Sequence, residues 1–209
     1  MISLETLLLF IGTVLILFLS PGPNMFFVLS YGIAHGAKGG LAAAFGIVAA
    51  DLVLTVLTAS GITALIAAWS GSFDILRFVG AAYLLWLAYN ALISSGQPKI
   101  GKSDNIPKLE IFKRAMLNSL LNPKALLFFM LFLPQFVHTK EGNVGWQLLT
   151  LGLVLTLVSA LFHSALGFFS GSVGHLFTRY PKAAKIQSYF LAAVMLFLAV
   201  RLVLLERPT

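Results

Sequence analysis

Six long apolar stretches constrain this 209-residue chain more than any other feature of its sequence. Each reaches the roughly 20 residues that a helix needs to cross about 30 Å of hydrocarbon. A segment in lipid must satisfy its own backbone hydrogen bonds, and the stretches lack the short alternating pattern of a membrane barrel. We therefore expect an all-α integral membrane protein with about six transmembrane helices. The expected spans are residues 4–33, 40–68, 73–94, 112–137, 146–176 and 186–205.

Composition supports this assignment. The chain is 59% hydrophobic and 10% charged, whereas soluble domains are about 45–50% apolar and about 25% charged. One core in a chain of this size cannot bury so much apolar surface, so membrane lipid is the expected surrounding. A soluble enzyme, a disordered protein and a water-soluble nucleic-acid binder are therefore excluded. The absence of cysteine excludes thiol redox chemistry and thiolate metal sites, and no cofactor or metal is expected.

The basic residues predict an orientation in the membrane. Because lysine and arginine collect in cytoplasmic loops, the first, third and fifth loops are expected in the cytoplasm and both termini in the periplasm. A five-helix alternative, with one segment only partly inserted, would move one terminus to the other side. The net charge of +7 then reflects these loops, and no nucleic-acid partner is expected. The basic residues of the three loops are Lys38, Lys99, Lys102, Lys108, Lys113, Arg114, Arg179, Lys182 and Lys185.

The two halves of the chain resemble each other. A proline, a Phe-Phe pair and a leucine recur at the same spacing in residues 21–29 and 123–131. Further on, residues 81–88 align with residues 192–199. Two matches in the same order are harder to attribute to chance than one, because leucine and alanine alone recur often in membrane helices.

This internal repeat predicts a domain organisation. Each half holds three expected helices, and three is odd, so the second half must be inverted relative to the first. Such 3+3 inverted-topology repeats are common in secondary transporters, where they allow alternating access. We expect a first three-helix repeat in residues 1–95, a basic cytoplasmic linker in residues 96–111, and a second three-helix repeat in residues 112–209.

The first and fourth helices are predicted to be broken. Prolines interrupt both, and backbone groups freed at membrane depth must line a cavity or find a polar partner. Ser20 and Asn122 are placed to cap the new half-helices, whose positive ends suit a carboxylate, whereas unwound carbonyls suit an ammonium group. We interpret the breaks as a site for a zwitterion; the alternative is a pair of kinks that only shape the helices. The candidate substrate-binding residues are Ser20, Pro21, Gly22, Pro23, Asn24, Asp51, Asn122, Pro123 and Lys124.

Three ionisable residues lie deep in the expected spans. Asp51 is the only acidic one, and an anion there must face a cavity, gain a partner or carry a proton. We expect Asp51 to bind a substrate ammonium group, to exchange a proton, or both; the alternative is an interhelical hydrogen bond. Lys124 could contact a substrate carboxylate, pair with Asp51 or extend to the cytoplasmic edge. His163 is interpreted as a packing residue rather than a proton relay.

These features favour a secondary exporter over an enzyme. No Walker A motif is present, so a proton or substrate gradient would supply the energy. A cation or metal-ion exporter is an alternative, but it would need several intramembrane Asp, Glu or His residues. An intramembrane enzyme would need a neighbouring base and nucleophile, and no catalytic triad or metal-ligand motif is found.

Several motifs resemble the LysE/RhtB family of bacterial amino-acid exporters. They are Leu19-Ser20-Pro21-Gly22-Pro23-Asn24, Gly39-Gly40-Leu41-Ala42-Ala43, the stretch from Gly46 to Asp51, Leu121-Asn122-Pro123-Lys124, and Phe132-Leu133-Pro134-Gln135-Phe136. The resemblance spans nearly the whole chain. It implies a multi-pass protein of the bacterial inner membrane that exports amino acids or close derivatives. Protons as partners, and hence an antiporter, are expected from Asp51 and the absence of a Walker A motif. It does not select the amino acid, and the chain's size is compatible with a homodimer.

Overall fold

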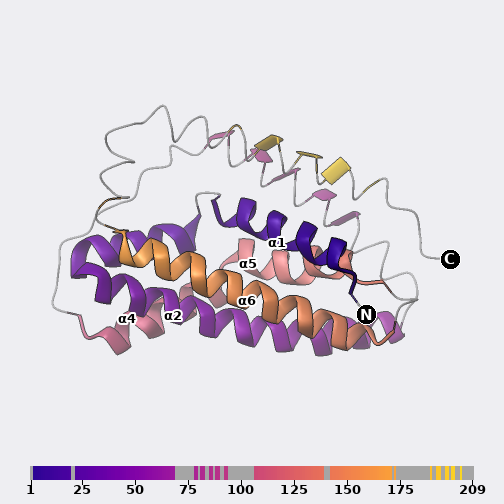
Figure 1. Ribbon diagram of the computed structural model, residues 1–209, viewed down its shortest axis with the longest axis horizontal. Helices are drawn as coiled ribbons and strands as arrows, with labels where there is room; N and C mark the ends of the chain where they lie inside the picture. Colours follow the sequence, from indigo (N-terminus) through magenta and orange to yellow (C-terminus); the bar gives the residue numbers. More distant parts are fainter. Residues whose placement is uncertain are drawn as a thin grey trace.

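The computed structural model describes residues 2–19, 22–68, 106–138 and 142–170, together with residue 172 and scattered positions between 78 and 93 and between 189 and 203. Every element in this described part is helical, as expected (Figure 1). The expected third and sixth spans, and most of the linker, fall largely outside it. The elements are α1 (Leu4–Leu19), α2 (Pro23–Ala68), α4 (Lys108–Leu120), α5 (Pro123–Leu127), a π-helical turn (Phe128–Phe132), a 3-10 turn (Leu133–Phe136) and α6 (Val144–Phe168).

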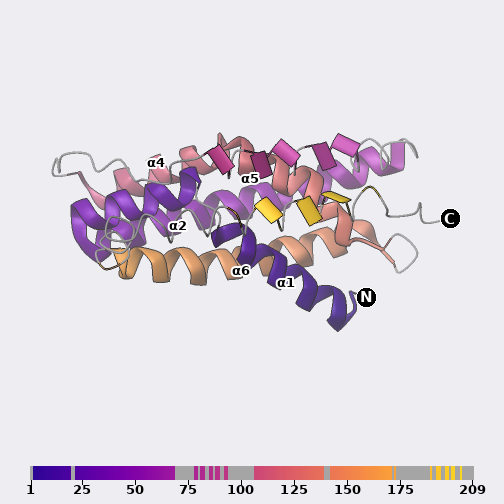
Figure 2. The same cartoon turned by 90° about the horizontal axis from the view of Figure 1, so that it is seen from above.

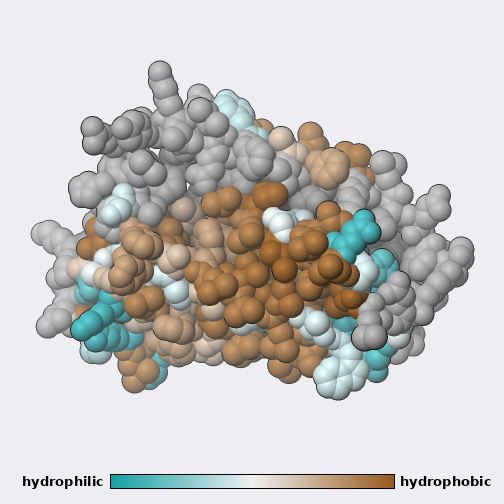
Figure 3. All heavy atoms as spheres, in the orientation of Figure 1, coloured by the Kyte–Doolittle hydropathy of each residue, from teal (hydrophilic) through white to brown (hydrophobic). Residues whose placement is uncertain are grey.

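The described helices suit a membrane. Pro23–Gly61 and Val144–Phe168 are long and apolar enough to cross one, and Lys108–Leu120 with Lys124–Phe136, bent by 55°, gives a third span if the pair is taken together. Large apolar side chains point outward, such as Leu157 and Leu161 at 62% and 68% exposed. Figure 3 shows a hydrophobic band across one face of the molecule, with hydrophilic residues toward its ends. Such a band fits the hydrocarbon of a bilayer.

Glycine and proline set where the helices break. Pro23 begins α2, whose only residue outside the helical region is Gly36, with φ 70° and ψ −175°. That φ favours glycine because it has no Cβ. At this point α2 folds back on itself (Figure 1). The expected loop between the first two spans, residues 34–39, is therefore one sharp turn within helical residues.

The second half differs from expectation in its boundaries. Helix α4 begins at Lys108, so it includes the last residues of the expected linker 96–111. The expected fourth span is divided at Leu121 and Asn122, and α5 then starts with Pro123. Helix α6 begins at Val144, because the Asn143 side chain accepts hydrogen bonds from two backbone N–H groups of its first turn.

The two broken segments run in opposite directions. Figures 1 and 2 both show α1 running away from the N-terminus toward one end of the molecule, whereas α4 and α5 run the other way. The rings of Phe10 on α1 and Phe136 in the 3-10 turn pack edge to face, with their centroids 5.1 Å apart. The arrangement brings the end of α1 beside the start of α5.

Small residues let the long helices approach closely. A Cβ added at Gly40 on α2 would lie 2.5 Å from the carbonyl oxygen of Gly167 on α6. One added at Gly46 would press on the backbone of Phe112 on α4. In both cases the obstacle includes backbone, which cannot rotate away. The small-residue pattern therefore fixes how α4 and α6 lie against α2.

We expect Gly40→Ala to lower the free energy of unfolding by about 1–3 kcal/mol, since the added methyl group forces α2 and α6 apart. The thermal unfolding midpoint in detergent measures this effect. Gly61→Ala on the same helix is the matched control, because nothing lies within 4 Å of its added Cβ. Its midpoint is expected to stay the same or rise. A Gly40→Ala midpoint equal to that of the wild type would contradict the close approach.

Candidate functional site

The two helix breaks are joined by asparagine side chains. Asn24, at the start of α2, accepts hydrogen bonds at Oδ1 from Nδ2 of Asn118 and from Nδ2 of Asn122, each at 3.1 Å. Its own Nδ2 donates to Ser119 Oγ at 2.9 Å. Two short polar stretches, about a hundred positions apart in sequence, therefore form one cluster at membrane depth.

Asn122 also caps the second half-helix. Its Oδ1 accepts from the backbone N–H of Lys124 at 3.0 Å, and Pro123 occupies the first helical position. This is the cap predicted from the sequence. The positive end of α5 is consequently held against the start of α2 by the same side chain. Ser20, the cap predicted for the first break, and Pro21 lie outside the described residues.

Lys124 points toward the other half-helix. Its Nζ donates to the backbone carbonyl of Leu17 at 3.5 Å. That carbonyl lies in the last turn of α1, where the break leaves acceptors without a helical partner. A cation at a helix C-terminus is also favoured by the helix dipole. A carbonyl in the last turn of α1 therefore accepts a hydrogen bond from an ammonium group of the protein itself.

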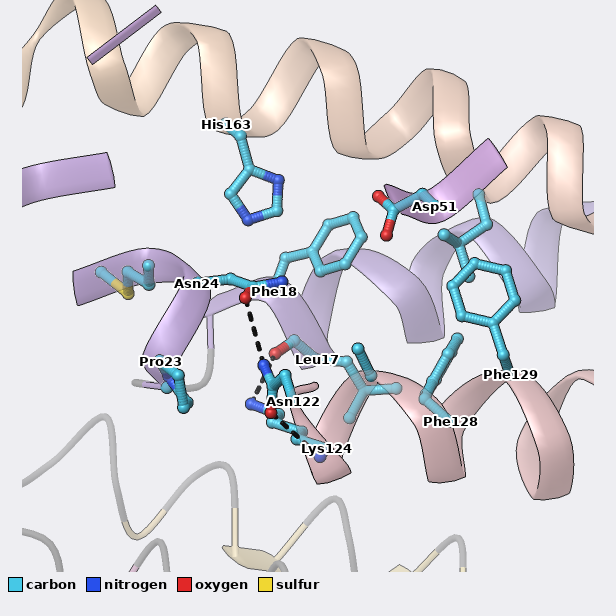
Figure 4. Close-up of a pocket in the computed structure, with 14 residues that line it drawn as sticks. Leu17, Phe18, Pro23, Asn24, Asp51, Asn122, Lys124, Phe128, Phe129 and His163 are labelled. Carbon is cyan, nitrogen blue, oxygen red and sulfur yellow. Dashed lines mark hydrogen bonds between the residues drawn. The ribbon is translucent and has the colours of Figure 1, made fainter. Parts of the chain in front are cut away.

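Asp51 is buried and bonded to α6. Its exposed fraction is 4%, and its Oδ2 accepts a hydrogen bond from Ser159 Oγ at 2.5 Å. The interhelical hydrogen bond that the sequence left as an alternative is therefore present. Figure 4 shows Asp51 and Lys124 on opposite sides of the pocket rather than paired with each other.

One cavity brings the predicted residues together (Figure 4). The volume of the cavity is about 70 Å³. Pro123 begins α5 next to it, but its side chain lies outside the described residues. The predicted residues that line the cavity are Gly22, Pro23, Asn24, Asp51, Asn122 and Lys124. The other lining residues are Leu17, Phe18, Met25, Ala125, Phe128, Phe129, Leu155 and His163.

The cavity has two chemical parts. Asn24, Asn122 and the two oppositely charged groups form its polar part, whereas Phe128, Phe129 and Leu155 form an apolar wall. Phe128 begins the π-helical turn, a local widening of the helix that is often found at functional sites. Such a cavity can hold a molecule with an ammonium group, a carboxylate and an apolar side chain.

Sequence reasoning missed part of this site, because Asn118, Ser119 and Ser159 were not singled out. His163, expected to be a packing residue, is buried and packs against Phe18 and Phe162, and it also lines the cavity. The spacing of the missed residues gave a usable signal, because residues four apart share a helix face: Asn118 precedes Asn122 by four, and Ser159 precedes His163 by four. What no spacing shows is that these faces meet Asn24 and Asp51.

Comparisons with known proteins identify the family of this chain. The family model described as LysE type translocator matches residues 15–206. The chain is 39% identical to the leucine efflux protein of Klebsiella pneumoniae, over 94% of this chain and 93% of that protein. It is 40% identical to the leucine efflux protein of an Enterobacter species, over 80% and 78%, and 34% identical to that of Salmonella typhimurium, over 94% and 93%. No solved structure gives a significant match.

Proposed function

Because this chain belongs to the LysE type translocator family, and is a transporter of the amino-acid export class rather than an enzyme, we propose that it exports leucine and similar aliphatic amino acids. Transport would cross the bacterial inner membrane and be driven by proton antiport. Family membership also favours amino-acid export over the cation export considered from the sequence. The single observation that carries the choice of substrate is the two-part cavity between the helix breaks.

The cavity suits a neutral amino acid. Lys124 offers a positive charge for the substrate carboxylate, and Asp51 offers a negative charge for its ammonium group. The aromatic wall formed by Phe128 and Phe129 then faces the substrate side chain. Among the described residues that line the cavity, Asp51 is the only carboxylate, so a second ammonium group, as in lysine, would find no partner there. Buried charges are unfavourable unless paired, which favours leucine over lysine.

The opposed broken segments support alternating access. In a 3+3 inverted repeat the two halves have nearly equivalent packings that open to opposite sides of the membrane. The antiparallel course of α1 and of α4 with α5 is what such a repeat requires around the site. We keep the predicted topology, with both termini periplasmic and the first, third and fifth loops cytoplasmic, as part of the proposal.

Asp51 would couple amino-acid export to proton uptake, because its carboxylate binds either the substrate ammonium group or a proton but not both. The deprotonated carboxylate binds the substrate ammonium group from the cytoplasm, and the carrier then opens outward. A periplasmic proton neutralises the carboxylate and the substrate leaves. The protonated carrier returns inward and releases its proton to the cytoplasm. Each cycle moves one amino acid out and one proton in, with Asp51 unchanged.

Leucine export from intact cells tests the proposal. Cells that express the protein and are loaded with leucine-containing dipeptides should release leucine faster than cells with an empty vector, and an uncoupler should remove the difference. Lysine-containing dipeptides serve as the matched control, because the cavity has no partner for the second ammonium group. Leucine release at the vector rate, or lysine release as fast as leucine release, would contradict the proposal.

A further inference from the structure

A chain of hydrogen bonds leads from Asp51 to His163. Ser159 Oγ donates its single proton to Asp51 Oδ2 at 2.5 Å, so it cannot also donate to the imidazole. His163 Nδ1 lies 3.0 Å from Ser159 Oγ and 3.0 Å from the Ser159 carbonyl oxygen, both of which are then acceptors. Nδ1 therefore carries the proton of the neutral ring, and Nε2 carries the lone pair.

The His163 end of this series of hydrogen bonds faces the cavity. His163 and Asp51 both line it, whereas Ser159 lies behind them and is fully buried. In Figure 4 the Nε2 edge of the imidazole points into the cavity, away from α6. The rings of Phe18 and Phe162 flank the imidazole, with centroids 5.2 and 5.3 Å away.

We propose that His163 and Ser159 form a proton relay that delivers the coupling proton to Asp51 from behind the substrate. The inference deepens the proposed function and rests on it, because a relay is needed only in a proton-coupled exporter. The groups that exchange the proton come from α2 and α6. The other charged side chain that lines the cavity, from α5, is Lys124.

The transfer balances at each atom. A hydronium ion that enters the cavity from the periplasm gives a proton to His163 Nε2 and becomes water, and the ring becomes an imidazolium. The Nδ1–H bond then breaks as its proton moves to Ser159 Oγ, while the hydroxyl proton of Ser159 moves to Asp51 Oδ2. The products are a neutral carboxylic acid, a restored hydroxyl and a neutral imidazole protonated at Nε2. The reverse sequence returns the proton to water in the inward-facing state.

This geometry separates the two tasks of the carboxylate. Oδ2 faces Ser159 and receives the proton, whereas Oδ1 serves the substrate ammonium group. A proton can therefore neutralise Asp51 while the substrate still occupies the cavity, which weakens its binding and promotes its release. Ser159 is fully buried and does not line the cavity, so removing its hydroxyl should affect coupling and leave binding intact.

Reconstituted protein in liposomes separates coupling from binding. Exchange of labelled for unlabelled leucine needs binding and alternating access but no proton transfer. Proton uptake driven by a leucine gradient, followed with a trapped pH-sensitive dye, needs the relay. For Ser159→Ala, whose side chain does not line the cavity, we expect exchange within about twofold of the wild type. For both Ser159→Ala and His163→Gln we expect a fall of at least about tenfold in protons moved per leucine.

Thr156→Val is the matched control. It removes a buried hydroxyl from the same helix, but that hydroxyl donates to the Gly152 carbonyl and does not contact Asp51. Thr156→Val should keep both leucine exchange and leucine-driven proton uptake. Size-exclusion chromatography of each variant checks folding, and His163→Gln tests the relay from its other end if Ser159→Ala does not fold.

The outcomes distinguish the relay from the proposed function. Wild-type proton coupling in folded Ser159→Ala or His163→Gln would overturn the relay. An equal loss of exchange and coupling in Ser159→Ala would also overturn it, because that result indicates a merely structural role. Leucine exchange without proton movement in the wild type would overturn the relay but leave leucine export standing. No leucine exchange in the wild type would overturn the proposed function, and the relay with it.

Discussion

Asp51→Asn is expected to reduce leucine export by at least about 30-fold, because removing one partner of a buried charge pair costs about 2–5 kcal/mol. The amide cannot exchange a proton and cannot neutralise the substrate ammonium group. Unlike Ser159→Ala, this variant should lose leucine exchange as well as leucine-driven proton uptake. Both are measured in liposomes that contain the purified protein.

Glu5→Gln provides the matched control for Asp51→Asn. It also converts a carboxylate to an amide, but Glu5 is exposed in the first turn of α1, away from the cavity. Its export rate should equal that of the wild type. Full proton-driven export by Asp51→Asn would remove the coupling role, and full leucine exchange would remove the ammonium contact.

Lys124→Gln is expected to weaken leucine transport by at least about 30-fold through a higher KM, since it removes the only positive charge proposed for the substrate carboxylate. The substitution should also remove the preference of the wild type for leucine over leucinamide. Leucinamide, which lacks the carboxylate, should compete poorly with leucine in the wild type and about as well as leucine in the variant. Competition against labelled leucine exchange measures both.

Lys113→Gln is the control for Lys124→Gln, because Lys113 is an exposed lysine on α4. It should leave the KM and the preference for leucine over leucinamide unchanged. If Lys124→Gln still prefers leucine as strongly as the wild type does, Lys124 only neutralises the end of α1 at the Leu17 carbonyl. The substrate carboxylate would then have to bind elsewhere, for instance at the N–H groups of α5.

Local chemistry explains why much of the site was predictable. Pro123 lacks a backbone N–H, so a break and a capping Asn122 could be expected wherever that residue interrupts an apolar stretch. Burial of Asp51 followed from its position in a long apolar span. The expected helix boundaries were less accurate. The first connection is a sharp turn at Gly36, and α4 starts at Lys108 inside the expected linker, because polar residues can begin a helix as readily as they form a loop.

The sequence by itself determined the helical character of the described elements, their apolar composition, the positions of the two breaks and the main charged residues near them. Only the tertiary structure decided which faces meet. Ser159 reaches Asp51 across 108 positions of sequence, and Asn24 reaches Asn122 across 98. In a membrane protein both the lipid-facing and the inward faces of a helix such as α6 are apolar, so hydrophobic periodicity does not fix its rotation. Close contacts such as Gly40 with Gly167 fix it instead, and they place His163 at the cavity.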